Sequence, residues 1–204
     1  MYNLFYFYMN RITKNYVKWM AINSWATSTS SVISTNSMLS SIMVTPSYTS
    51  LVTTTYIGKD IIGQLGGLAY AWKTGKNADK EPLKYVTNGV IVQQMAIALE
   101  NSSMLITDRN FVLPFLGLSS VLKNSSFISI GAVNASNLQK LSKNNIGEFY
   151  SRVASINTIS SSIGMITGIG IIHFVPSYTI RSLLILPVLS CISIYSIRKA
   201  TKLS

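Results

Sequence analysis

Charged residues in this chain gather in short clusters that separate long uncharged runs. The uncharged runs cover residues 19–58, 86–99, 153–180 and 182–197. Basic residues flank these runs, at 11–18, 73–84, 140–152 and 198–202. A helix on the surface of a soluble protein carries charge along one face, whereas a helix that spans a bilayer carries it at its ends. The pattern therefore predicts membrane-embedded helices with basic ends.

The composition points the same way. Only 11% of the residues are charged, against about 25% in an ordinary soluble protein, and the mean hydropathy is +0.35. Ser, Thr and Asn are abundant, which favours helices that meet through small polar side chains. A soluble, buried, Ser-rich helical subunit is the alternative that the composition leaves open.

The formal net charge of +11, from 17 basic and 6 acidic residues, suits ribosomal RNA, an anionic membrane face or positive-inside loops. RNA-coating proteins carry Lys and Arg along whole helix faces, so the clustering favours a membrane. We expect other membrane subunits and anionic lipids as partners. Nucleic acid is less favoured but stays open. No cofactor is expected, although structural lipids such as cardiolipin would suit the basic ends.

The predicted fold is all-α, a helical membrane bundle of about four to six helices, in which residues 182–197 are about long enough to cross a bilayer. No period-2 pattern of a strand is sustained. An aromatic cluster at residues 2–8 resembles a membrane-interface anchor, with a hydrophobic dock onto a neighbouring helix as the alternative. We expect Pro46 to end the first helix, and Pro187 to kink the last. The expected helices cover residues 17–44, 51–72, 83–104, 111–138, 147–175 and 182–197.

Glycines at helical spacing predict two close-packing faces. Gly63, Gly66 and Gly67 fall on neighbouring positions of one helix, and Gly164 and Gly168 on neighbouring positions of another. Without Cβ atoms, such faces allow two backbones to approach closely.

Residues for catalysis or metal binding are scarce. Cys191 is the only cysteine and His173 the only histidine, so a Cys/His zinc cluster cannot be built. The six carboxylates are scattered, and no phosphate-binding Gly-x-x-x-x-Gly-Lys-Ser/Thr loop is present. We therefore predict a non-enzymatic protein without catalytic, cofactor-binding or metal-binding residues.

The most functional-looking charges are Lys59 and Asp60, which interrupt an apolar helix. Ionisable groups inside a membrane are costly and face partners or a water path. We expect Glu100 and Lys123 to join them in an intramembrane charge site. The alternative is that Lys59 and Asp60 mark the start of an interfacial helix.

Two stretches resemble the root-UV-B-sensitive (RUS) family. In residues 59–100 the matching positions are Lys59, Asp60, Gly63, Gly66, Ala71, Trp72, Gly75, Asp79, Lys84, Tyr85 and Glu100. In residues 144–170 they are Thr158, Gly164 and Gly168. The resemblance runs from Lys59 to Ile197, and it implies a helical protein of organelle membranes without naming a reaction.

The sequence also departs from the family pattern. Ile61 replaces a glycine, Glu148 an aspartate, and Arg152 stands near an expected lysine. Residues 1–58, a basic and aromatic segment with a Ser/Thr-rich helix, are shorter than the family's N-terminal region. We therefore expect a reduced, divergent member, with a RUS-like membrane domain at residues 59–204.

Three functions follow from these features. The first is a structural or accessory subunit of a large mitochondrial inner-membrane assembly, a respiratory complex or ATP synthase. The second is an independent carrier or lipid-handling membrane protein with its site at Lys59 and Asp60. The third is a recruited mitochondrial ribosomal subunit that contacts RNA.

Overall fold

The computed structural model describes residues 11–42, 49–74, 80–106, 108–142 and 146–202. These residues form six long helices and no strand, which confirms the all-α prediction. The aromatic cluster at 2–8 and Pro46 lie outside the described residues. The elements are α2 (Arg11–Ile42), α3 (Thr49–Thr74), α4 (Pro82–Ser102), the 3-10 turn η2 (Ser103–Leu105), α5 (Arg109–Ser142), α6 (Ile146–Phe174), α7 (Tyr178–Ile180), the π-turn η3 (Arg181–Ile185) and α8 (Leu186–Thr201).

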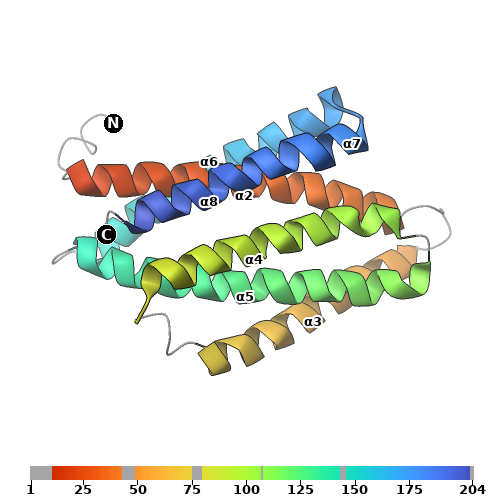
Figure 1. Ribbon diagram of the computed structural model, residues 1–204, viewed down its shortest axis with the longest axis horizontal. Helices are drawn as coiled ribbons and strands as arrows, with labels where there is room; N and C mark the ends of the chain where they lie inside the picture. Colours follow the sequence, from red (N-terminus) through yellow and green to blue (C-terminus); the bar gives the residue numbers. More distant parts are fainter. Residues whose placement is uncertain (1–10, 43–48, 75–79, 107, 143–145, 203–204) are drawn as a thin grey trace.

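The six long helices run up and down alternately. In Figure 1, α2, α4 and α6 run in one direction, and α3, α5 and α8 run in the other. Helix α2 packs against α6, α8 and α4, whereas α4 also packs against α5 and α8. Helix α3 makes its main contact with α5. The bundle therefore has α2 and α4 at its centre and α3 on one flank.

The bundle buries polar side chains among its apolar core residues and exposes large apolar side chains on its outer surface. Ser30, Ser34 and Ser37 of α2 are fully buried. By contrast, Ile166 and Ile169 of α6 are more than 60% exposed. In water this distribution would expose a large apolar surface, but in a bilayer the lipid tails cover it. The architecture is that of a membrane protein.

Three helices are long and apolar enough to cross a membrane. They cover Phe111–Ser142, Ile146–Phe174 and Tyr178–Thr201. The more polar α2 lies along two of them, α6 and α8. Ser and Thr side chains of α2 form hydrogen bonds to both of these neighbours. Ser24 Oγ donates to Asn157 O of α6 at 3.0 Å, and Thr27 Oγ1 lies 3.1 Å from Ser193 Oγ of α8.

Glycines set the spacing at two helix pairs. A Cβ on Gly164 would lie 2.5 Å from Trp25 O, and one on Gly168 would lie 2.8 Å from Val32 Cβ, so α2 and α6 touch at backbone distance. Thr29 Oγ1 donates to Gly164 O across this contact at 3.0 Å. On the other flank, a Cβ on Gly63, Gly66 or Gly67 of α3 would lie within 2.9 Å of a side-chain atom of Ser120, Val121 or Asn124 of α5, so these glycines make room for the side chains of α5.

The last helix differs from its expected form. It is helical from Tyr178, so Arg181 lies inside the helix rather than ahead of it. The π-turn Arg181–Ile185 comes just before Pro187. Proline lacks the N–H that an α-helix needs, and a π-turn is one way in which a helix accommodates the gap.

Basic residues lie at one end of the bundle, where α2, α4 and α6 begin and α3, α5 and α8 end (Figure 1). We call it the basic end. In the described residues it comprises Arg11, Lys14, Lys18, Lys73, Lys80, Lys84, Lys140, Arg152, Arg198, Lys199 and Lys202. The opposite end carries far fewer cations among the described residues, so the charge is asymmetric along the helix axes.

Candidate functional site

A buried ion pair joins α4 to α5 in the interior of the bundle. Lys123 Nζ of α5 contacts Glu100 Oε2 of α4, and the two side chains are only 19% and 4% exposed. Ser34 Oγ of α2 donates to the same carboxylate oxygen at 2.7 Å. We call Glu100 and Lys123 the central charge pair. Its position among three helices makes it the best-enclosed ion pair of the described residues.

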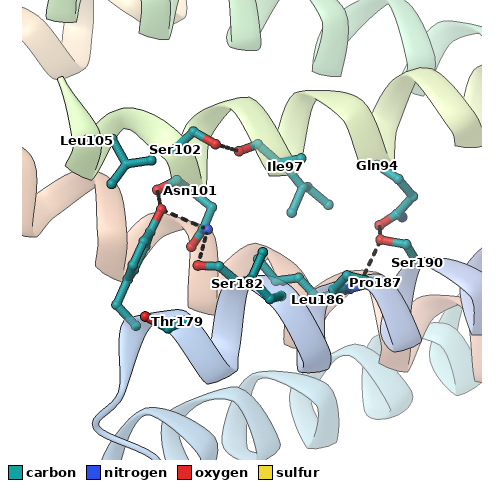
Figure 2. A pocket seen from close by; sticks show the side chains of 13 residues that line it. Gln94, Ile97, Asn101, Ser102, Leu105, Thr179, Ser182, Leu186, Pro187 and Ser190 are labelled. Carbon is teal, nitrogen blue, oxygen red and sulfur yellow. Dashed lines mark hydrogen bonds between the residues drawn. The ribbon is translucent and has the colours of Figure 1, made fainter.

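A layer of hydrogen bonds around Asn101 lies next to the central charge pair. Ser37 Oγ of α2 donates to Asn101 Oδ1 at 2.7 Å, and Asn101 Nδ2 donates to Ser182 Oγ at 2.7 Å. Tyr178 OH donates to Asn101 O at 3.0 Å (Figure 2). One amide therefore ties α2, α4 and the start of the last helix together.

A second hydrogen-bonded layer lies about two turns along α4. Ser190 Oγ donates to Gln94 Oε1 at 3.0 Å, and Gln94 Nε2 donates to Ser193 Oγ at 3.2 Å. Ser193 Oγ in turn donates to Asn23 Oδ1 of α2 at 2.7 Å. Amides and hydroxyls thus connect α2, α4 and α8 within the bundle interior, beside buried apolar residues such as Ile97, Leu186 and Leu189.

An open groove runs between α4 and the last helix. It has a volume of about 430 Å³ and is lined by Gln94, Asn101, Tyr178, Ser182 and Ser190 together with apolar side chains such as Leu183. Figure 2 shows Gln94 and Ser190 of one layer, and Asn101 and Ser182 of the other, along this groove. Small-molecule sites of about this size combine apolar walls with a few polar groups.

Lys59 and Asp60 form a separate pair on α3. Lys59 Nζ lies 2.8 Å from Asp60 Oδ1, with side-chain exposures of 11% and 46%. The same ammonium lies 4.5 Å from the centre of the Tyr56 ring. A lysine that is shielded on one side while its carboxylate partner reaches the surface fits a helix flank better than an enclosed site.

The structure thus brings together two of the four residues expected at one charge site. Helices α3 and α5 are parallel, with Gly58 facing Leu113 and Gly63 facing Ser120 and Asn124. At 1.5 Å per residue, this register places Lys59 roughly 10 Å from Lys123 along the axis. No described contact joins the two pairs.

The sequence does not indicate the interior positions of several polar residues. It does not single out Ser34, Gln94 and Asn101, because Ser, Gln and Asn recur throughout the uncharged runs. It predicts Arg181 ahead of the last helix, yet this residue is inside the helix and 5% exposed. The available signal is Pro176, since a helix that starts soon after it includes Arg181. In the described ranges no group of three His, Cys, Asp or Glu side chains could hold a metal ion.

Comparison with known families identifies the chain. The family described as "Vitamin B6 photo-protection and homoeostasis domain" matches residues 8–203. The chain belongs to this family. The match confirms the RUS resemblance and includes α2, which precedes the stretch that the sequence motifs cover. No curated protein and no solved structure matches the sequence.

Proposed function

We propose that this RUS-family protein is a non-enzymatic membrane carrier, with the central charge pair on the path of its cargo. The family description names vitamin B6 homoeostasis, so the cargo we propose is a vitamin B6 compound. The observation that carries the proposal is the ion pair of Glu100 and Lys123, enclosed among α2, α4 and α5.

Energetics favours a role beyond stability for this pair. Moving two charges out of water costs several kcal/mol per ion, and an apolar pair of similar volume is often as stable or more stable. Ionisable groups inside membrane bundles mark substrate and ion pathways for this reason. The ion pair can open when a charged cargo competes for one of its partners, and Ser34, which already donates to Glu100 Oε2, would solvate the freed carboxylate.

Flux through reconstituted protein tests the proposal. We would place the full chain in sealed proteoliposomes and measure uptake of radiolabelled pyridoxine, pyridoxal and pyridoxal 5′-phosphate. We expect saturable uptake of at least one of them, and a loss of at least about tenfold in Glu100→Gln, since a tenfold change corresponds to only about 1.4 kcal/mol.

Glu148→Gln is the matched control, because it makes the same chemical change in an exposed ion pair with Arg152. Its uptake should equal that of the wild type. Equal uptake by Glu100→Gln and the wild type, or no uptake of any of the three compounds by folded wild-type protein, would refute the carrier proposal.

A second candidate is an accessory subunit of a mitochondrial inner-membrane assembly, a respiratory complex or ATP synthase. Helix α3 supports it: its outward side chains Leu65, Leu68 and Trp72 are 63%, 67% and 93% exposed, an apolar face that another membrane subunit could cover. Native-gel sizing of mild detergent extracts discriminates the two. Migration within a large complex favours the subunit, and migration at monomer size favours the carrier.

A further inference from the structure

The start of α2 and the end of α8 carry cations that the described chain does not balance. The two helices pack side by side, and these ends meet at the basic end of the bundle (Figure 1). No Asp or Glu occurs in residues 1–59 or 149–204. The described acids at this end, Glu81 and Glu148, are each paired with a cation close to them in sequence. The positive charge between α2 and α8 therefore suits an external anion.

Two lysines and two aromatic rings form one continuous surface at this place. We call it the α2–α8 seam, and it comprises Lys18 and Trp19 of α2 with Tyr195 and Lys199 of α8. The Trp19 and Tyr195 rings meet edge to face, with centroids 5.5 Å apart and planes at 80°. Lys18 Nζ lies 5.9 Å from the centre of the Trp19 ring, and Lys199 Nζ lies 5.5 Å from that of Tyr195. Each contact thus links one of these side chains to the next, and an ammonium group lies at each ring.

The seam is accessible from outside and held in place from inside. Lys18, Tyr195 and Lys199 are exposed, whereas Trp19 packs against the hydrophobic core of the bundle. Neither ammonium group lies in an ion pair with another described residue. An ammonium near the face of an aromatic ring is attracted to it, so the rings hold both lysines at a surface that an anion can reach.

The surface below the seam fits acyl chains. Val188 precedes Tyr195 by two helical turns, so both lie on one side of α8, and Val188 is 52% exposed. Aromatic rings favour the headgroup level of a bilayer, and lysine side chains extend from there into the polar region. Cations, rings and aliphatic surface thus follow one another in the order of phosphate, glycerol and acyl chains in a phospholipid. A nucleic acid would match the cations and the rings, but not the aliphatic surface below them.

We propose that the α2–α8 seam binds the headgroup of an anionic phospholipid. Lys18 and Lys199 hold the phosphate, and Trp19 and Tyr195 contact the glycerol region. Cations next to a membrane-spanning helix attract anionic lipids in general, and the aromatic pair makes this attraction local. The bound lipid is retained rather than transported, so the inference goes beyond the carrier proposal. It is tested without flux, and the two proposals fail separately.

Native mass spectrometry of the full chain tests the seam. The protein is reconstituted in vesicles of equal parts phosphatidylcholine and phosphatidylglycerol and extracted into mild detergent, and the lipids retained on it are counted. We expect the wild type to retain phosphatidylglycerol in preference to phosphatidylcholine. Lys18→Gln/Lys199→Gln should lower the ratio of the two retained lipids by at least about tenfold, since each cation near an anionic surface contributes roughly a fivefold factor.

The matched control is Lys73→Gln/Lys140→Gln, which removes the same charge from exposed positions on α3 and α5 at the basic end. This control should keep the wild-type ratio, and circular dichroism checks that each variant is folded. Tyr195→Leu keeps the charge but loses the ring, and should lower the ratio by about threefold. Equal ratios in the wild type and Lys18→Gln/Lys199→Gln, an equal loss in the control, or no loss in Tyr195→Leu would overturn the proposal.

A gel-shift assay with single-stranded poly(U) separates a lipid site from an RNA site. A preference for phosphatidylglycerol without a poly(U) shift supports the lipid. A poly(U) shift that Lys18→Gln/Lys199→Gln abolishes, together with no lipid preference in the wild type, would overturn the proposal in favour of RNA.

Discussion

At the scale of single residues, the interior of this protein depends on a few compensated charges. Lys123 of α5 and Ser34 of α2 both contact the same carboxylate oxygen, Oε2 of Glu100 on α4. The sequence marks Glu100 and Lys123 as unusual because they interrupt apolar runs. It could not show that they pair with each other rather than with Lys59 and Asp60, because partner choice depends on which faces α3, α4 and α5 present.

Breaking the central charge pair from one side should destabilise the protein strongly. Lys123→Met leaves the Glu100 carboxylate buried without its cation, which costs about 3–5 kcal/mol. The double variant Glu100→Gln/Lys123→Met should recover much of this loss. Reversible unfolding in mixed detergent, followed by circular dichroism, measures both free energies.

Lys84→Met provides the control, since it breaks an exposed pair with Glu81 whose side chains are 73% and 63% exposed. Such pairs contribute about 0–1 kcal/mol. If Lys123→Met were no more destabilising than Lys84→Met, the central charge pair would not be an enclosed interaction.

At the scale of helices, small residues decide which elements touch. The extents of α3, α4 and α6 could be predicted from charge clusters and prolines, since both ends of each lie within two residues of the expected ones. Helix α2 begins six residues earlier than expected, and α5 and the last helix extend four residues beyond their expected ends. The pairing of α2 with α6 and of α3 with α5 could not be predicted from the sequence. Glycine spacing marks a smooth face, but it does not specify the partner helix.

Two glycines on one helix provide a sharp test of the α2–α6 contact. Gly164→Ala would place a Cβ 2.5 Å from Trp25 O, so the helices must separate at a cost of about 1–3 kcal/mol. A Cβ on Gly170 would meet no described atom within 4 Å, so Gly170→Ala should be neutral or stabilising by about 0.5–1 kcal/mol through helix propensity. Unfolding free energies in detergent compare them, and equal effects would contradict the close contact.

At the scale of the whole molecule, Ser, Asn and Gln side chains are buried among the apolar core residues, and cations gather at one end. Both features suit a membrane. In a bilayer, lipid would cover the apolar exterior, and the positive-inside rule predicts that the basic end stays on the side from which the helices insert. The separation of charge along the chain is visible in the sequence. The gathering of the positive charge at one end of the bundle is not visible in the sequence, because it depends on each helix running opposite to the one before it.

The alternating direction of the six long helices predicts that they cross a membrane alternately, with the start of α2 and the end of α8 on the same side. Single cysteines in a Cys191→Ser background test it, using exposed positions and a membrane-impermeant maleimide on sealed vesicles of known orientation. We predict that Lys18→Cys and Lys202→Cys label from one side and Ser177→Cys from the other. Labelling of Lys18→Cys and Lys202→Cys from opposite sides, or of all three from the same side, would contradict this alternating arrangement.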